Sequence, residues 1–268
     1  MKFLAAAVQM LASDDKEANL NEAELRIREA ARRGAQVVAL PEVFNWRGDK
    51  NDEPRVAEPI PGPTTERIAR LARQLGLQIL AGSILEEIAG ERRVYNTSAL
   101  FDSGGNLVAT YRKIHLFDVA IGTAVSVLES ETRAPGSAPV VAETGLCTVG
   151  LTICYDLRFP ELYRALVAQG AKLIFVPAAF TALTGEAHWE TLVRARAIEN
   201  QVYVVAPNQF GKPPKSFATY GNSMIVDPWG RVIARASDGP GVICAEIDLD
   251  YLARVRTELP ALSHRKLF

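Results

Sequence analysis

Three residues that lie far apart in the sequence have side chains suited to one kind of chemistry. Pro41 and Glu42 end the apolar run of "AQVVALPEVF", Lys113 follows the strand-like run of "LVATYRKIHLF", and Cys154 closes "CTVGLTIC". A thiol, a carboxylate base and an ammonium together supply what acyl transfer through a cysteine requires. Taken singly, Glu42 is typical of a solvated loop residue and Lys113 of a surface charge. The catalytic interpretation therefore depends on the fold bringing all three together.

Cys154 can be interpreted in two ways from its own segment, "LTICYDLRFPELYR". Strand alternation places Cys147 and Cys154 on opposite faces, so the two thiols should not pair, and they lack the CxxC spacing of a metal site. Cys154 lies where the strand should end, because a helix pattern with Pro160 in its first turn soon follows. Ligands of open α/β sheets bind beyond such strand ends, whereas a lone cysteine is more often a small buried hydrophobe. The segment alone leaves both interpretations open.

Alternating strand-like and helix-like segments would position these residues. Helical patterns occupy residues 16–34, 64–76, 160–170 and 185–201, and strand patterns occupy residues 3–10, 35–40, 77–85, 96–102, 107–114, 147–154, 172–180, 202–209, 222–230 and 241–248. The alternation predicts a layered α/β fold, with hairpin pairing around the turn "DSGGN". Neither half differs in composition from the other, so residues 1–268 are expected to form one domain.

Composition excludes several kinds of partner. The 268 residues contain 30 Lys+Arg and 31 Asp+Glu, for a formal net charge of −1. This balance disfavours nucleic acid and a polybasic membrane patch, and no stretch approaches the ~18 apolar residues of a membrane span. Three cysteines disfavour a disulfide framework and favour a reducing, cytoplasmic setting.

The remaining histidines and cysteines have weaker functional interpretations. His115, His188 and His264 lack paired ligand spacing, so we expect no zinc site. A cysteine–histidine dyad stays open as an alternative, with His188 as its one plausible member. Cys147 and Cys244 lie within apolar strand patterns and are expected to fill the core.

The segments around the three candidate residues resemble a known family. "LPEVF" around Glu42, "YRKIHLF" around Lys113 and "ICYDLRFPELYR" around Cys154 are similar to the three signature segments of the nitrilase superfamily, the carbon–nitrogen hydrolases. The resemblance covers nearly the whole chain, in the expected order. Residues 177–209 and 220–230 resemble the Nit branch, where "AFT" and "RARAIENQ" are closer to deaminated glutathione amidases than to ω-amidases.

The resemblance implies a role for each matching residue. Glu42 would be the general base, Cys154 the nucleophile, and Lys113 the cation that stabilises the tetrahedral oxyanion. A second family glutamate matches Glu129 in "VLESETRAPG" and would orient Lys113 or assist proton transfer. A free thiol with a pKa near ~8.5 is mostly protonated at neutral pH, so it needs such a base or cation.

Two residues beside the nucleophile would bind substrate. The backbone N–H of Tyr155 would be the second oxyanion donor, and Arg158 matches a position that binds a substrate carboxylate in some branches. Attack on an amide carbonyl would give a thioester with loss of ammonia, and water activated by Glu42 would release the acid.

The resemblance also implies a fold and a substrate class. The fold would be a four-layer α-β-β-α sandwich, and the activity that of a cysteine-dependent amidase without a metal or organic cofactor. The substrate would be a small carboxylate-bearing amide, with deaminated glutathione preferred and α-ketoglutaramate or α-ketosuccinamate as the alternative. A non-catalytic interaction protein on the same fold is a further alternative, although it would not need the three residues together. A homodimer or larger homo-oligomer is implied as well.

Three segments depart from the branch pattern. Asn222 stands in "YGNS" where "YGHS" is common, Gly211–Thr219 forms an unusual "GKPPKSFAT" loop, and "IGTAVSV" replaces a glycine–proline turn. We expect these segments near the mouth of the pocket, where they would influence substrate length and end-group preference.

Overall fold

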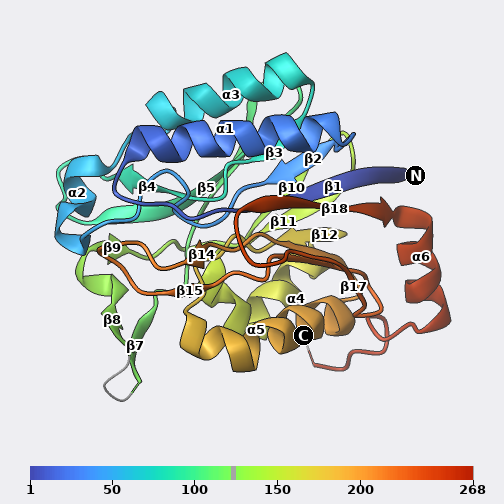
Figure 1. The fold of residues 1–268 in the computed structure, drawn as a ribbon. Coiled ribbons are helices and arrows are strands. Elements are labelled where there is room, and N and C mark those ends of the chain that lie inside the picture. Colours follow the sequence, from blue (N-terminus) through green and yellow to red (C-terminus); the bar gives the residue numbers. More distant parts are fainter. Residues whose placement is uncertain (122–124, 268) are drawn as a thin grey trace.

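Two β-sheets lie face to face between two layers of helices (Figure 1). The computed structural model describes residues 1–121 and 125–267, so the central residues of "IGTAVSV" lie outside the described part of the chain. Helices α1 (Lys16–Arg32) and α3 (Pro63–Leu75) cover one sheet, and α4 (Pro160–Ala168) and α5 (Ala182–Asn200) cover the other. The expected four-layer α-β-β-α sandwich is confirmed.

The first sheet has the strand order β18-β1-β2-β3-β5-β4, and β6 and β9 also pair with β5. Its strands are β1 (Lys2–Gln9), β2 (Val37–Ala39), β3 (Gln78–Leu80), β4 (Ile84–Glu87), β5 (Val94–Phe101), β6 (Leu107–Arg112), β9 (Arg133–Ala134) and β18 (Gly241–Asp248). Strands β1, β2 and β3 are parallel, which requires the crossovers that α1 and α3 provide. The β5–β6 hairpin turns at "DSGGN", as the sequence predicts.

The second sheet has the order β10-β11-β12-β13-β16-β17. Its strands are β10 (Val140–Glu143), β11 (Thr148–Leu151), β12 (Leu173–Phe175), β13 (Tyr203–Ala206), β16 (Met224–Val226) and β17 (Val232–Arg235). Strands β11, β12 and β13 are parallel and are joined through α4 and α5. The carboxyl ends of these strands therefore meet at one edge, where polar side chains can converge.

Strand β1 contributes to both hydrophobic layers because successive side chains point to opposite faces. Ala5 and Ala7 belong to the core between the sheets, together with Leu151. Ala6 and Val8 belong to the core beneath α1 and α3. One short apolar strand thus contributes side chains to both hydrophobic cores, the one between the sheets and the one beneath α1 and α3.

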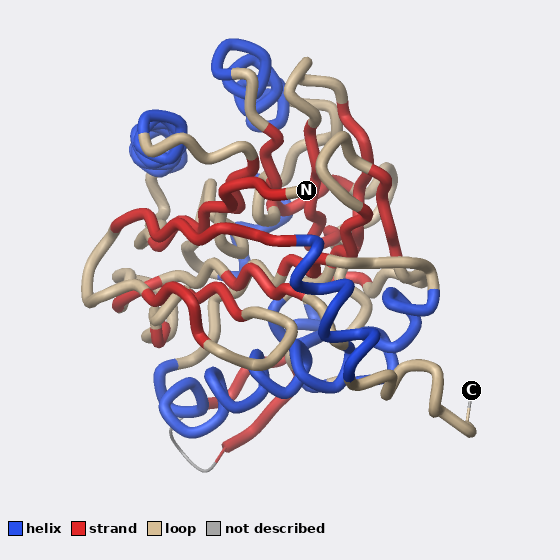
Figure 2. The backbone as a smooth tube through the Cα atoms, turned by 90° about the vertical axis from the view of Figure 1, so that its right-hand side faces the viewer, coloured by secondary structure: helices blue, strands red, loops and turns tan. Residues whose placement is uncertain are grey.

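Several elements escape prediction, and all of them except the ten-residue helix α6 are too short for a periodic pattern. They are α2 (Glu53–Val56), α6 (Leu249–Glu258), the hairpin of β7 (Asp118–Ile121) and β8 (Val125–Leu128), the hairpin of β14 (Phe210–Gly211) and β15 (Thr219–Tyr220), and the 3₁₀ turns η1 (Lys50–Asp52), η2 (Glu129–Glu131) and η3 (Cys154–Arg158). The strands of each hairpin pair antiparallel. Figure 2, turned by 90° from Figure 1, shows the main strands in the middle of the molecule with helices above and below them. Across the described ranges, no helix combines the length and apolarity needed to cross a membrane.

The single strand expected at residues 77–85 is wrong, because the structure divides it into β3 and β4. Gly82 interrupts it with a φ of 37°, and a Cβ built there would lie 1.9 Å from the carbonyl oxygen of Pro41. Only glycine permits this backbone contact. The break therefore lets the chain pass directly against the segment that leads into Glu42.

Candidate active site

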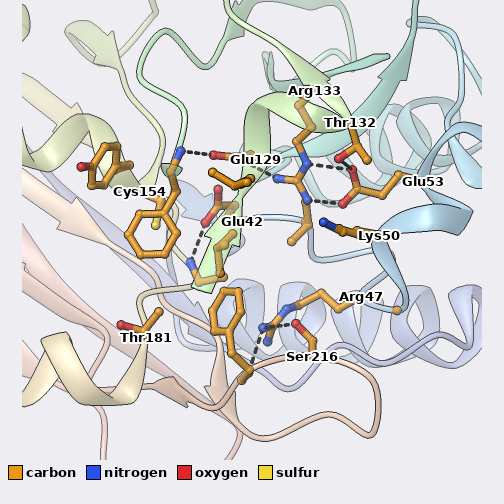
Figure 3. Close-up of a pocket in the computed structure, with 18 of the residues that line it drawn as sticks. Glu42, Arg47, Lys50, Glu53, Glu129, Thr132, Arg133, Cys154, Thr181 and Ser216 are labelled. Atoms are coloured by element: carbon orange, nitrogen blue, oxygen red, sulfur yellow. Dashed lines mark hydrogen bonds and ion pairs between the residues drawn. The ribbon is translucent and has the colours of Figure 1, made fainter. Parts of the chain in front are cut away.

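Cys154 lies in the wall of a cavity of about 350 Å³ that also contains Glu42, Lys113 and Glu129 (Figure 3). Strand β11 ends at Leu151, and Cys154 begins η3 with a φ of 47°. A non-glycine residue rarely adopts this conformation, which costs about 1–3 kcal/mol. The backbone N–H of Cys154 donates to the carbonyl oxygen of Pro177 at 2.9 Å, which ties the turn to the end of β12.

The carboxylate of Asp156 holds this turn from within the core. Its Oδ2 accepts the backbone N–H of Ile153 at 2.8 Å and the hydroxyl of Tyr111 at 2.7 Å. Its Oδ1 accepts the backbone N–H of His115 at 3.1 Å and contacts the Nδ1 of the same residue at 2.8 Å. Asp156 is fully buried, so these contacts keep both oxygens satisfied and fix the strained turn.

Glu42 follows β2 and is held by three donors. Its Oε1 accepts from Asn96 Nδ2 at 2.8 Å and from Lys113 Nζ at 3.0 Å, and its Oε2 accepts the backbone N–H of Ala179 at 2.8 Å. The side chain is almost fully buried. A buried carboxylate fixed by three donors is preorganised to receive a proton from one direction.

Lys113 lies between two carboxylates. Its Nζ is 3.0 Å from Glu42 Oε1 and 2.9 Å from Glu129 Oε2, and the residue is only 2% exposed. Burial alone would lower the pKa of Lys113, but the negative charges of Glu129 and Glu42 outweigh burial and raise the pKa well above its ordinary value. Lys113 is therefore a permanent cation at neutral pH.

Glu129 is fixed in turn by Arg133 and by a backbone group. Arg133 Nη1 donates to Glu129 Oε1 at 2.5 Å, and the N–H of Phe117 donates to Glu129 Oε2 at 2.6 Å. Burial would raise the pKa of Glu129, but the charges of Lys113 and Arg133 hold it well below its ordinary value. Arg133 also pairs with Glu53 at 2.6 Å, so the chain of charges ends on α2 (Figure 3).

The surroundings of the Cys154 thiol oppose its ionisation. Burial and the negative charge of Glu42 raise the pKa of Cys154 well above its ordinary value, and the opposing effect of Lys113 is smaller. Glu42 is a buried carboxylate in the same cavity wall, and a carboxylate is a side chain that can accept a thiol proton.

Tyr155 and Arg158 occupy different positions relative to the cavity. Tyr155 lines it, whereas Arg158 is not among its described wall residues. The guanidinium of Arg158 lies over the rings of Phe180 at 5.2 Å and Tyr155 at 5.8 Å, and both rings line the cavity. Its Nη1 is 3.3 Å from His188 Nδ1. The carboxylate-binding role of Arg158 stays a prediction.

The cysteine–histidine alternative has no support from the position of His188. This residue contacts Arg158 and is not among the described wall residues, whereas Glu42 and Lys113 line the same cavity as Cys154. Cys147 and Cys244 are free thiols, and burial raises the pKa of Cys147 to about 12. Within residues 1–121 and 125–267, no cluster of three or more His, Cys, Asp or Glu side chains could hold a metal ion.

The departures from the branch pattern separate into two positions. Ser216 and Phe217 of the Gly211–Thr219 loop line the cavity, as expected for a specificity segment. Asn222 is not among the described wall residues. Its side-chain Nδ2 donates to the backbone carbonyl oxygen of Tyr220 at 3.0 Å. Its backbone carbonyl oxygen accepts a hydrogen bond from Trp189 Nε1 at 2.8 Å. Asn222 thus supports the backbone near the start of β16 and does not itself line the cavity.

Sequence reasoning overlooked three residues of the site. Asn96 holds Glu42, Arg133 holds Glu129, and Arg47 lines the cavity. The spacing of four residues between Glu129 and Arg133 was an available signal, although it occurs outside any helix pattern. Asn96 and Arg47 had no such signal because their partners lie far away in the sequence.

Comparisons with known proteins identify the family. The family model described as "Carbon-nitrogen hydrolase" matches residues 4–257. Omega-amidase NIT2 of Xenopus tropicalis is 46% identical over 99% of this chain and 95% of its own length. Deaminated glutathione amidase of Bos taurus is 44% identical over 98% of this chain and 82% of its own length. The chain belongs to the carbon–nitrogen hydrolase family, in the Nit branch of the nitrilase superfamily.

Solved structures show the same fold. The C. elegans NitFhit protein superposes with a TM-score of 0.93 at 39% identity over 99% of this chain, which spans 65% of that longer protein. An amidase of Nesterenkonia sp. AN1 superposes with a TM-score of 0.81 at 26% identity over 96% of this chain and 95% of its own. That structure is a glutamate-to-glutamine mutant with covalent addition of the acetamide moiety of fluoroacetamide at the active-site cysteine.

Proposed function

We propose that this protein is an amidase in which Cys154 attacks the carbonyl carbon of a small, carboxylate-bearing amide. The observation that carries the proposal is the buried contact of Lys113 with Glu42 and Glu129 in the cavity wall that contains Cys154. Two carboxylates and a lysine are costly to bury together, and a scaffold would gain nothing from placing a thiol beside them. The related Nesterenkonia amidase, in which a cysteine carries a covalent adduct, supports a cysteine nucleophile.

In the first half of the reaction, Glu42 accepts the proton of Cys154 as sulfur bonds to the carbonyl carbon. Lys113 Nζ and the backbone N–H of Tyr155 stabilise the negative charge that develops on the carbonyl oxygen. Because Lys113 keeps its charge and is fixed by Glu129, it does not have to reorganise during the step. The tetrahedral intermediate collapses to a thioester, and the departing nitrogen takes the proton from Glu42.

In the second half, water replaces the leaving group. Glu42 removes a proton from water, the resulting oxygen attacks the thioester carbon, and the same two donors stabilise the oxyanion. The carbon–sulfur bond breaks, the acid leaves, and Cys154 regains its proton. Glu129 positions Lys113 throughout and does not itself contact the acyl group in this scheme.

Deaminated glutathione is our preferred substrate, and a short ω-amide of an α-keto acid is the second candidate. The bovine relative named deaminated glutathione amidase supports the first, and the frog relative named omega-amidase supports the second. The leaving groups of the two substrates differ. The amide bonds of deaminated glutathione are peptide bonds, whereas an ω-amide ends in an unsubstituted amide group. Hydrolysis of deaminated glutathione releases a peptide amine, so the expectation that ammonia always accompanies the acid holds only for the ω-amides.

Direct comparison of the two substrates tests the proposal. Initial rates would be measured with detection of both ammonia and peptide amine, using wild-type protein, Cys154→Ala, and Cys244→Ala as a matched control at a free thiol outside the cavity wall. We expect turnover in the wild type and control and none in Cys154→Ala. Absence of turnover by the wild type on both substrates and a wider amide panel would refute the proposal.

We also propose that the protein is cytoplasmic and assembles as a homodimer or larger homo-oligomer. The three free thiols support a reducing compartment. Helix α5 exposes Leu183 and Ile198, and Trp229 is exposed in the turn before Gly230, which packs on Ile198. Exposed apolar side chains of this kind suit a self-contact. Analytical ultracentrifugation of wild type and Ile198→Glu would test it, with a smaller species expected for the variant.

A further inference from the structure

Arg47 differs from every other cation in the described cavity wall, because it has no carboxylate partner among the described residues. The other four wall cations each form an ion pair: Lys50 with Glu131, Lys113 with Glu42 and Glu129, Arg133 with Glu53 and Glu129, and Lys215 with Asp14. Arg47 is therefore the one cation of the described cavity wall that forms no direct ion pair.

Arg47 is buried and held in a defined orientation. It is 5% exposed, and its Nη2 donates to Ser216 Oγ at 3.2 Å and to the carbonyl oxygen of Phe217 at 3.3 Å. The guanidinium carbon lies 5.2 Å from the ring centre of Phe217. Figure 3 shows the side chain extending from its loop toward the middle of the drawn residues. Two residues of the unusual Gly211–Thr219 loop thus hold the Arg47 side chain in place.

One nitrogen of this guanidinium is unsatisfied. Nη1 is buried and has no hydrogen-bond partner among the described residues. Burial lowers the pKa of Arg47 to about 10, with Glu42 opposing and Arg133 reinforcing the shift, so the group stays charged at neutral pH. A buried cation without an ion-pair partner is costly, and such a cost is typical of a group that awaits a ligand.

The nearby carboxylates do not fill this role. Glu42 is occupied by Asn96, Lys113 and the backbone of Ala179, and Glu53 is occupied by Arg133. Arginine presents parallel N–H groups that match a carboxylate, so a substrate carboxylate is the natural partner.

We propose that Arg47 binds a carboxylate on the leaving-group side of the substrate, an inference that rests on the proposed amidase function. Arg158, the residue predicted to bind a substrate carboxylate, lies over the rings of Tyr155 and Phe180, whereas Arg47 lies on the wall formed with Ser216 and Phe217. The cavity volume of about 350 Å³ falls within the range of pockets that hold drug-sized ligands. This volume is larger than a short ω-amide requires. The substrate class is therefore a peptide-like amide that carries a carboxylate at each end.

Binding measurements in the non-reactive Cys154→Ala background test this assignment. The two ligands are deaminated glutathione and its C-terminal carboxamide, which differ only in the leaving-group carboxylate. Titration calorimetry should show that Arg47→Gln weakens binding of the acid about 10- to 100-fold and leaves binding of the carboxamide unchanged. Lys212→Gln removes an exposed charge from the same loop outside the described cavity wall and should leave both ligands unaffected.

A second variant separates ligand binding from loop support. Arg47→Lys keeps the charge without the paired N–H groups, so it should retain part of the preference for the acid over the carboxamide. Equal weakening of both ligands by Arg47→Gln, no weakening of either, or absence of binding of the acid to otherwise native protein would each overturn the assignment. Failure of the proposed function would give a different result. Arg47→Gln would still weaken binding of the acid, but protein with intact Cys154 would release no product from it.

Discussion

Replacing Glu42 with glutamine should lower both the pKa of the Cys154 thiol and the amidase rate. The Glu42 carboxylate is one of the causes that raise the pKa of Cys154, whereas Lys113 lowers it. The glutamine side chain is nearly the same size but carries no charge and cannot accept a proton. The thiol of Glu42→Gln should therefore ionise more readily while the protein catalyses less.

The expected magnitudes follow from the contacts of Glu42. A neighbouring charge shifts a pKa by about 1–3 units, so the pKa of Cys154 should fall by that amount when the carboxylate is removed. Loss of a general base costs about 10²- to 10⁴-fold in rate, which corresponds to about 3–5 kcal/mol of transition-state stabilisation. The glutamine NH2 group cannot accept a hydrogen bond, so at least one buried donor that faced Glu42 loses its acceptor, at a cost of about 1–3 kcal/mol in stability.

Two assays on the same protein samples measure these effects. The rate of alkylation of Cys154 by iodoacetamide, followed by peptide mass spectrometry across the neutral and alkaline range, reports the pKa of the thiol. Initial rates on deaminated glutathione and α-ketoglutaramate report catalysis. Glu186→Gln is a matched control, because Glu186 is exposed on α5 and outside the described cavity wall. Urea unfolding confirms that each variant is folded.

Either of two results would contradict the role assigned to Glu42. Turnover of Glu42→Gln within a few-fold of wild type would show that Glu42 is not the base. An unchanged or higher pKa of Cys154 in this variant would show that the carboxylate does not suppress ionisation of the thiol. Faster alkylation together with slower hydrolysis is the result that the account requires.

Two further predictions concern the charges around Lys113. Lys113→Ala should lower kcat/KM at least about 100- to 1000-fold through loss of an oxyanion donor, and should destabilise the fold by about 3–5 kcal/mol because Glu42 and Glu129 lose their buried partner. Initial rates and urea unfolding measure the two effects, and near-normal turnover would contradict the assignment. Glu129→Gln should reduce stability most above pH ~4.5, because the lowered native pKa of Glu129 makes its contribution disappear as pH falls through that pKa. Unfolding measured over acidic pH checks this, and a stability difference that persists at the lowest pH would contradict it.

The layered fold and three site residues could be predicted because local signals agree with the global arrangement. Glu42, Lys113 and Cys154 each follow an apolar run that forms a strand, and strand ends of a sandwich of this kind meet at one edge. The ends of two helices could also be predicted, because the residues that determine them lie next to the helix in the sequence. Asp15 caps α1 with its side chain, and Gly76 ends α3 in the left-handed conformation.

The rest depends on contacts that no local pattern reveals. The break at Gly82 results from the backbone of Pro41, about forty residues away in sequence, and Arg47 is held by Ser216 and Phe217 from the other half of the chain. Nothing in the sequence around Arg47 distinguishes it from an ordinary surface arginine, because the loop that buries it is distant. Asp156 likewise shows its role only through Tyr111 and His115, which lie on another segment.

The central claim is that an acyl group passes through the sulfur of Cys154. Rapid quenching of the reaction with deaminated glutathione or α-ketoglutaramate, followed by mass spectrometry of the peptide that contains Cys154, tests this claim most directly. We expect an acyl adduct on Cys154 that forms within the first turnover and disappears as the acid product accumulates. Product formation without any such adduct, together with retained turnover by Cys154→Ala, would contradict it.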